Sequence, residues 1–160
     1  MQLNAARALE RTDEDFMEAA LAAARSAAAS AEVPIGAAVV VDGEIIAVAG
    51  NAPIGLSDPT AHAEVLALRR AAQAVGNYRL TGATLYATVE PCIMCVGAAL
   101  HARIERIVFG CRDSKAGALG SVYDLGRDAR LNHCLQVTAD VAATQARELL
   151  QTFFRLRRGA

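Results

Sequence analysis

Two short segments of the chain carry side chains that suit one metal ion, although they lie far apart in the sequence. His62-Ala63-Glu64 supplies an imidazole and a carboxylate, and Pro91-Cys92-Ile93-Met94-Cys95 supplies two thiols. One imidazole and two thiolates leave the fourth position of tetrahedral zinc open for water, which is typical of a catalytic rather than a structural site. The chain must therefore fold so that both segments meet around one ion.

The spacing of the cysteines predicts that they lie at the start of a helix. Pro91 is a residue type favoured in the first helical turn, and Cys92 and Cys95 are three residues apart, so both sulfurs can share one face of that turn. The partial positive charge at a helix N-terminus also favours the thiolate form that a metal ligand must adopt.

The histidine segment predicts a second helix start. Asp58-Pro59-Thr60 precedes a run rich in Leu and Ala, which places His62 and Glu64 in the opening turn. Two residues apart on a helix correspond to a rotation of about 200°, so these two side chains cannot face a metal in the same way. We therefore expect His62 to be the third ligand and Glu64 to lie beside the zinc-bound water as an acid–base group.

Other interpretations of the Cys-x-x-Cys pair are a redox pair, a disulfide or half of a structural zinc site. His101 is the nearest candidate for a fourth ligand, but on a continuous helix it would lie roughly 9 Å beyond Cys95 along the axis. Cys111, His133 and Cys134 have no ligand-like spacing and are expected to be packed or surface residues. A redox pair would leave the His-x-Glu segment without a role.

The rest of the sequence predicts alternating helices and strands. Thr12-Asp13-Glu14-Asp15 predicts the cap of an alanine-rich helix that runs toward Ser30. The other expected elements are a hairpin with strands at 35–41 and 44–48, helices at 58–74, 92–102 and 141–158, and strands at 83–89, 106–110 and 135–137. This order implies crossover connections and parallel pairing, and it favours a mixed α/β sheet with helices on both faces. The two ligand-bearing helices would begin at neighbouring strand ends, where ligand sites of such folds gather.

Composition limits the organisation of the chain. With 160 residues, 54% of them hydrophobic, we expect one domain at 12–158, preceded by a flexible leader at 1–11. No apolar run approaches the roughly 20 residues of a membrane helix, so we expect no membrane contact and a cytoplasmic protein. The long segment at 111–132, rich in Gly, Ser and Asp, is expected to be functional. Because the net charge is −1, any nucleic-acid contact must come from a local basic patch.

The two motifs together resemble the signature of the zinc nucleoside and nucleobase deaminases, the cytidine and deoxycytidylate deaminase superfamily. From about Phe16 to Arg158 the chain is similar to the bacterial tRNA-specific adenosine deaminases. The similar segments are 51–55 (Asn-Ala-Pro-Ile-Gly), 58–64, 77–80, 83–86, 108–110, 120–121 and 153–155.

This resemblance implies a cytidine-deaminase-like fold, which is a three-layer α/β/α arrangement with a five-stranded mixed sheet. It implies one zinc ion per chain, a homodimer, and a tRNA anticodon stem-loop as the partner. The implied activity is that of a zinc hydrolase that converts the wobble adenosine to inosine by attack of zinc-activated water at C6. Glu64 would move the protons.

The resemblance also assigns residues to the nucleoside pocket. Asn51 matches an asparagine that contacts the target nucleoside, Ile35 and Val89 match apolar walls, and Asp113 matches an acidic residue near the sugar. Without the resemblance, Ile35 and Val89 would be ordinary core residues of strands, Asn51 a turn residue and Asp113 a loop cap.

The C-terminal segment 153–158 combines aromatic rings, which can stack on bases, with guanidinium groups, which can contact phosphates. The alternative is that basic residues there only stabilise the dipole of a helix C-terminus. The candidate RNA contacts are Phe154, Arg155, Arg157 and Arg158.

Two positions depart from the family pattern, and two other functions remain open. Ala52 stands where the family usually has a basic residue, and Ser57 where a ring is often found, which affects details of tRNA contact. A deaminase of a free base or nucleoside, such as guanine, cytosine or cytidine, would share the zinc, Glu64 and the fold. A zinc-stabilised interaction module without activity would have no need of Glu64.

Overall fold

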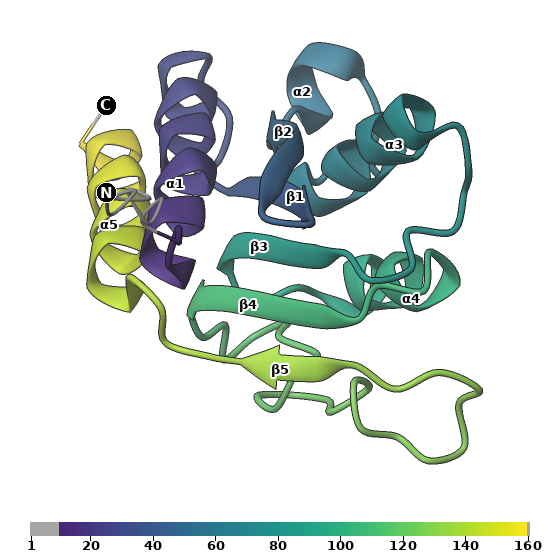
Figure 1. Ribbon diagram of the computed structural model, residues 1–160. Helices are drawn as coiled ribbons and strands as arrows, with labels where there is room; N and C mark the ends of the chain where they lie inside the picture. The colour runs from purple at the N-terminus through teal and green to yellow at the C-terminus, as the bar shows by residue number, and fades with distance from the viewer. Residues whose placement is uncertain (1–9, 160) are drawn as a thin grey trace, which may run out of the picture.

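A five-stranded mixed sheet forms the centre of the structure, a computed structural model that describes residues 10–159 (Figure 1). The strands are β1 (Gly36–Val41), β2 (Glu44–Gly50), β3 (Thr84–Val89), β4 (Arg106–Cys111) and β5 (Gln136–Thr138), in the spatial order β2-β1-β3-β4-β5. β1 pairs antiparallel with both β2 and β3, whereas β3, β4 and β5 are parallel. The expected hairpin, the parallel pairing and the fold class are confirmed.

Helices cover both faces of the sheet (Figure 1). Helices α1 (Asp13–Ala29) and α5 (Ala143–Arg158) lie side by side on one face, and α3 (Ala63–Val75) and α4 (Ile93–His101) pack on the other. The short helix α2 (Pro53–Leu56) lies between β2 and α3 in the chain and was not expected from the sequence.

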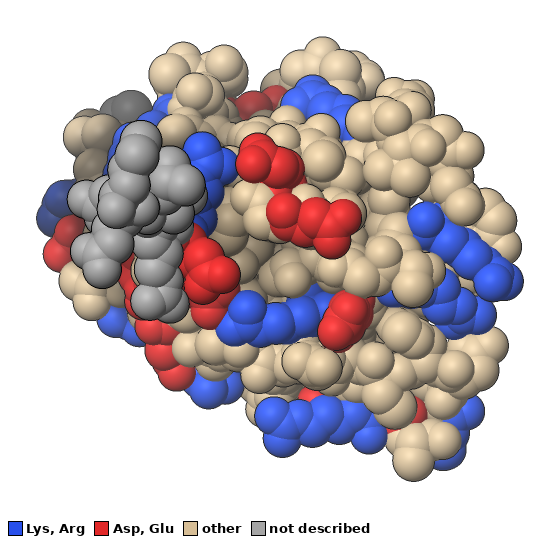
Figure 2. Space-filling model, viewed as in Figure 1, with Lys and Arg blue, Asp and Glu red and all other residues tan. Residues whose placement is uncertain are grey.

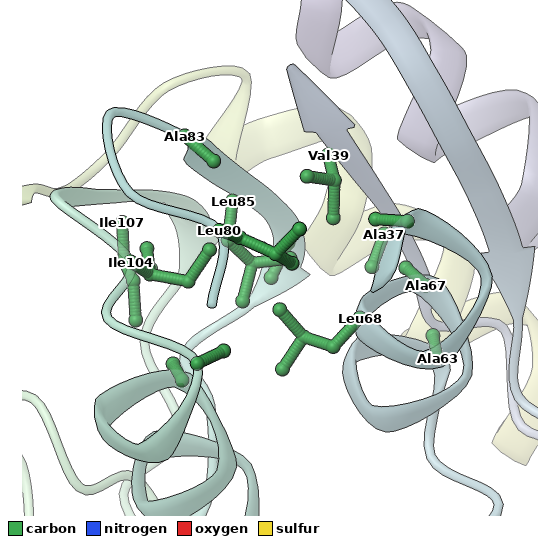
Figure 3. Packing of buried hydrophobic residues seen from close by; sticks show 14 of the residues in the cluster. Ala37, Val39, Ala63, Ala67, Leu68, Leu80, Ala83, Leu85, Ile104 and Ile107 are labelled. Atoms are coloured by element: carbon green, nitrogen blue, oxygen red, sulfur yellow. The ribbon is translucent and has the colours of Figure 1, made fainter. Parts of the chain in front are cut away.

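The core consists of two apolar clusters, one on each side of the sheet. Because both faces are covered, the central strands are continuous hydrophobic runs and do not alternate with polar residues. Figure 3 shows side chains of α3 directed toward those of the strands in the first cluster. The helix contributes Ala63, Ala67 and Leu68, and the strands contribute Val39, Leu85 and Ile107. The second cluster lies between the sheet and helices α1 and α5, and includes Phe16, Met17, Leu21, Tyr86 and Val108.

Two glycines allow α1 to approach the sheet closely. Gly36 and Gly50 are paired across β1 and β2. A Cβ atom on Gly36 would collide with the α1 backbone at Ala20, and one on Gly50 would lie 2.7 Å from the carbonyl oxygen of Ala23. Glycine is therefore required where the helix crosses the hairpin.

The start of α1 is fixed by a capping box and an ion pair. The Thr12 hydroxyl accepts a hydrogen bond from the Asp15 N–H, and the Asp15 carboxylate accepts one from the Thr12 N–H, as the sequence predicts. The Asp13 carboxylate accepts two hydrogen bonds from Arg106, at 2.6 and 2.9 Å, and one from the Tyr86 hydroxyl at 2.7 Å. The Arg106 guanidinium lowers the pKa of Asp13, and the contact ties α1 to β3 and β4.

The helices that carry the candidate ligands begin later than the sequence suggests. Helix α3 begins at Ala63, and the Asp58 side chain does not cap it. The Asp58 carboxylate instead accepts hydrogen bonds from the N–H and the hydroxyl of Thr60, which closes a separate turn before the helix. Helix α4 begins at Ile93, one residue after Cys92. His62 and Cys92 are thus the N-caps of their helices.

The proposed leader at 1–11 lies mostly outside the described residues. Glu10 and Arg11 belong to no helix or strand. Among the helices at 10–159, none combines the length and hydropathy that crossing a membrane requires.

Candidate metal centre

The strand directions explain why the two ligand segments meet. β2 and β3 are both antiparallel to β1, so they run in the same direction and their carboxyl ends lie at the same edge of the sheet. The segment that follows β2 leads to His62, and the segment that follows β3 leads directly to Cys92. Helices α3 and α4 therefore begin next to one another at this edge.

His62, Cys92 and Cys95 form one group, as the sequence predicts. The His62 Nδ1 atom lies 3.6 Å from the Cys92 Sγ atom and 3.5 Å from the Cys95 Sγ atom. The three donor atoms all lie within 4.8 Å of one another. Two of the three residues are half-buried and Cys95 is buried.

These separations fit a zinc ion. Zinc binds sulfur at about 2.3 Å and imidazole nitrogen at about 2.0–2.1 Å in tetrahedral geometry, which places bound N and S atoms about 3.5 Å apart. One nitrogen and two sulfurs are also a donor set that zinc prefers. Because the group at 10–159 offers three protein ligands, a fourth tetrahedral position is left for a small molecule.

The pKa values of the two thiols are also consistent with a bound cation. Hydrogen bonds from Cys95 and from His62 lower the pKa of Cys92 to about 4, so this sulfur is readily anionic. The same pairing, together with burial, raises the pKa of Cys95. The protein alone favours one thiolate, and a divalent metal ion is what ionises a second ligating thiol.

Glu64 lies beside the ligand group and is 4% exposed. Its Oε2 atom accepts a hydrogen bond from the Cys95 thiol at 3.5 Å. Burial raises the pKa of Glu64, because a carboxylate away from water is penalised. A buried carboxyl group next to an open coordination position can accept a proton and return it within one reaction cycle.

Asn51 and Ile35 are brought to the same edge. Asn51 is 8% exposed, and its Oδ1 atom accepts a hydrogen bond from the Ala63 N–H at 2.9 Å, in the first turn of α3. A backbone N–H can only donate, which fixes Oδ1 on this side and directs the Asn51 NH₂ group away from Ala63. The Asn51 N–H donates to the carbonyl of Ile35, a half-buried residue packed against both core clusters.

Val89 and Asp113 lie at the carboxyl ends of the neighbouring parallel strands β3 and β4. Val89 is the buried last residue of β3, three positions before Cys92. The Asp113 Oδ1 atom accepts hydrogen bonds from the N–H groups of Lys115 and Ala116, so this side chain caps a turn of the loop between β4 and β5. The loop-cap interpretation of Asp113 thus describes its contacts within the chain.

The sequence analysis missed Glu90, a buried acidic residue at this edge. Glu90 is 2% exposed and its carboxylate accepts hydrogen bonds from Asp113, Leu119 and Ser121. The available signal was an acidic residue at the end of an otherwise apolar strand, directly before the Pro-Cys-x-x-Cys segment. A buried carboxylate at such a position needs several hydrogen-bond donors, so it predicts a contact with a distant loop.

The other histidines and cysteines do not join the group. Cys111 is buried in the second cluster, and Cys134 is exposed. A ring nitrogen of His133 lies 2.7 Å from the carbonyl oxygen of Ile104, and His101 is exposed in the last turn of α4. They are packed or surface residues, as expected.

The end of α5 lies next to the loop that contains Asp113. A cleft of about 460 Å³ separates them, and its lining residues are Lys115, Leu150, Gln151, Phe154, Arg157 and Arg158. Arg155 does not line it and donates a hydrogen bond to the Thr152 hydroxyl. Figure 2 shows basic and acidic side chains interspersed on the face of the molecule that it displays.

Comparisons with known proteins agree with this chemistry. Residues 10–111 match the family model of the cytidine and deoxycytidylate deaminase zinc-binding region. The chain is 48% identical over 157 residues to the tRNA-specific adenosine deaminase of Haemophilus influenzae, covering 98% of this chain and 91% of the relative. It is 46% identical over 149 residues to that of Agrobacterium fabrum, covering 93% and 97%.

Two solved structures have a similar fold. One, described in work on A-to-I editing by tRNA A34 deaminases at the wobble position, has a TM-score of 0.82 and 45% identity, covering 84% of this chain and 98% of its own. The guanine deaminase of Bacillus subtilis has a TM-score of 0.64 and 32% identity, covering 94% and 96%.

Zinc content tests the ligand assignment. We expect the parent protein to carry one zinc ion per chain, and we expect Cys92→Ser and Cys95→Ser to lose it because a hydroxyl replaces a thiolate ligand. Cys111→Ser and Cys134→Ser are matched controls that should keep it, since neither sulfur belongs to the group. Elemental analysis of the purified variants provides the measurement. A full complement of zinc in Cys92→Ser would disprove the assignment.

Proposed function

Because the chain belongs to the cytidine and deoxycytidylate deaminase family, and within it to the tRNA-specific adenosine deaminases, we propose that it hydrolyses adenosine to inosine at the wobble position of a tRNA anticodon. The observation that carries this proposal is a buried carboxyl group, Glu64, beside a three-ligand zinc site. A structural site would not need it. Identity of 48% and 46% to two tRNA-specific adenosine deaminases, against 32% to a guanine deaminase, supports tRNA as the substrate.

The ligands and Glu64 divide the chemistry between them. When bound by His62, Cys92 and Cys95, zinc supplies an activated water, whose pKa falls from about 15.7 to about 7. Glu64 takes one proton from the attacking water and delivers it to the ring nitrogen next to C6. As the C6–N bond breaks, Glu64 transfers the second proton to the amino group, which leaves as ammonia. One carboxyl group within reach of each atom can perform both transfers.

The nucleoside pocket is formed by Asn51, Ile35, Val89 and Asp113. The Asn51 oxygen is held by α3, which leaves its two N–H donors for an acceptor on the nucleoside. The apolar side chains of Ile35 and Val89 limit access of water to the reacting base. Asp113, at the start of the loop after β4, would accept a hydrogen bond from a sugar hydroxyl.

The end of α5 binds the RNA outside the pocket. Lys115, Arg157 and Arg158 line one cleft with Phe154, a residue that is 42% exposed, so cations and an aromatic side chain are combined. This combination suits the single-stranded part of an anticodon stem-loop. Arg155 would contact phosphate from outside the cleft.

The remaining assignments concern the whole molecule. We place residues 12–158 in one deaminase domain, because both core clusters share the same sheet. A tRNA substrate supports a cytoplasmic location. The resemblance supports a homodimer, and exposed apolar side chains on α2 and at the start of α4 (Ile54, Leu56 and Ile93) offer a surface that would favour it.

A direct assay tests the substrate. We expect the zinc-loaded protein to convert the wobble adenosine of an anticodon stem-loop to inosine, and to act poorly on free adenosine, guanine and cytidine, because contacts outside the pocket contribute to binding. Inosine in the digested RNA and released ammonia are measured in parallel. A stem-loop with guanosine at the wobble position is the control. Rapid release of ammonia from guanine with no inosine in the RNA would replace this proposal by a free-base deaminase.

Glu64→Gln separates metal binding from catalysis. The variant keeps the size of the side chain and leaves His62, Cys92 and Cys95 unchanged, so zinc content and stem-loop affinity should stay near those of the parent. Turnover should fall by at least about 10²–10⁴, because both proton transfers lose their carrier. Single-turnover kinetics with saturating stem-loop give the rate. Parent-like turnover in this variant would exclude Glu64 from the mechanism.

The salt dependence of binding tests the α5 contacts. Arg157→Ala combined with Arg158→Ala should weaken stem-loop binding and flatten the slope of log K against log salt by about 0.7 for each lost phosphate contact. The rate with saturating RNA should change much less, because these residues position the substrate. Arg25→Ala combined with Arg130→Ala is the charge-matched control, since both guanidiniums lie in exposed ion pairs with neighbours on the protein. If the salt dependence of binding has the same slope in both double variants, Arg157 and Arg158 only stabilise α5.

A further inference from the structure

The loop between β4 and β5 is attached to the metal site by the side chain of Glu90. The Glu90 Oε1 atom accepts hydrogen bonds from the Asp113 N–H at 3.3 Å and from the Ser121 hydroxyl at 2.5 Å. The Oε2 atom accepts hydrogen bonds from the N–H groups of Leu119 at 3.1 Å and of Ser121 at 3.2 Å. One carboxylate thus gathers donors from both ends of the segment 113–121, which we call the arch.

Backbone contacts bring the arch against the ligand segment at the same place. Cys92 and Gly117 form an antiparallel bridge, and the Ala118 N–H donates to the carbonyl of Pro91 at 2.9 Å. The Glu90 carboxylate lies inside the arch, so close to Gly117 that a Cβ atom on this residue would collide with it. Glycine at 117 is therefore required to admit the carboxylate.

The position of Glu90 in the chain connects two parts of the site. It is the first residue after β3 and lies two positions before the ligand Cys92, while its side chain holds the N–H of Asp113. Asp113 in turn caps the turn that presents Lys115 to the cleft beside α5. The Glu90 carboxylate, together with the backbone contacts at Pro91 and Cys92, thus sets the position of the arch relative to the ligand segment.

A buried carboxylate is costly unless hydrogen bonds replace its hydration, and an apolar side chain would fill the end of β3 without that cost. Donors from three residues of the arch satisfy the charge of Glu90, so the arch is held in the one conformation in which all of them converge. Misplacement of a substrate-positioning group by about 1 Å can lower a rate about 10²-fold, so such rigidity affects the reaction.

We propose that Glu90 is a positioning residue that fixes the arch 113–121 relative to the zinc ligands, and thereby places Asp113 and Lys115 against the bound RNA. This inference rests on the proposed function. Glu90 itself contacts only the protein and takes no part in proton transfer.

The test compares zinc-loaded variants of the full chain with the wobble-adenosine stem-loop as substrate. Glu90→Gln replaces one oxygen by an NH₂ group that faces N–H donors, so the arch should loosen and kcat/KM should fall about 10–100-fold with zinc retained. Ser121→Ala removes a single hydrogen bond and should show a smaller loss in the same direction. Asp13→Asn is the control for general stability, because its ion pair lies at the start of α1. It should lower Tm and leave kcat/KM unchanged.

Two further readouts distinguish positioning from stability alone. Amide hydrogen exchange at 113–121 should accelerate in Glu90→Gln and not in Asp13→Asn. Asp113→Asn should lower kcat/KM in the parent but much less in the Glu90→Gln background, because Asp113 is already misplaced there.

The outcomes separate the inference from the function on which it rests. If the parent edits the stem-loop and Glu90→Gln does so equally well, the positioning role is wrong while the function stands. Unchanged exchange in the arch, or fully multiplicative effects of the Glu90 and Asp113 variants, would also overturn it. If Glu90→Gln does not fold, Ser121→Ala decides by the same criteria. A parent protein that does not edit RNA refutes the proposed function, whereas the exchange experiment still tests the attachment of the arch.

Discussion

The common direction of β2 and β3 is the constraint on which the site depends. Both strands are antiparallel to β1, so the chain leaves the sheet twice at the same edge. Each exit leads into a helix whose N-cap is a candidate ligand, His62 in one case and Cys92 in the other. The metal site therefore joins two helix N-termini, whose partial positive charge favours anionic sulfur and a nearby carboxylate.

The apolar core residues and the buried polar side chains occupy different parts of the interior. Most of the core is aliphatic, and alanines and glycines let α1 and α3 approach the sheet closely. The buried polar side chains among residues 10–159 are Glu32, Asn51, Glu64, Thr88 and Glu90. Four of them accept hydrogen bonds from backbone N–H groups, at the start of β1 or in the segments that follow strands at the ligand edge. Main-chain hydrogen bonds thus replace the hydration that these four side chains lose on burial.

Glu64 and Glu90 show how two buried carboxyl groups at one edge can serve different purposes. Glu90 accepts four hydrogen bonds from the arch and its charge is fully satisfied, which makes it a rigid attachment point. Glu64 has one contact with a side chain, the Cys95 thiol, and burial raises its pKa.

The sequence by itself determined the features that depend on neighbouring residues. The ligand types and their spacing, the Thr12 capping box, the hairpin and the alternation of helices and strands follow from chemistry within a few positions along the chain. The tertiary structure decided which distant segments meet. The role of Glu90 depends on a loop that returns 23 to 31 residues later, and the cleft at α5 exists only because Lys115 and Arg157 are brought together. Local patterns cannot specify such contacts, because the strand order and the path of the connecting loops set them.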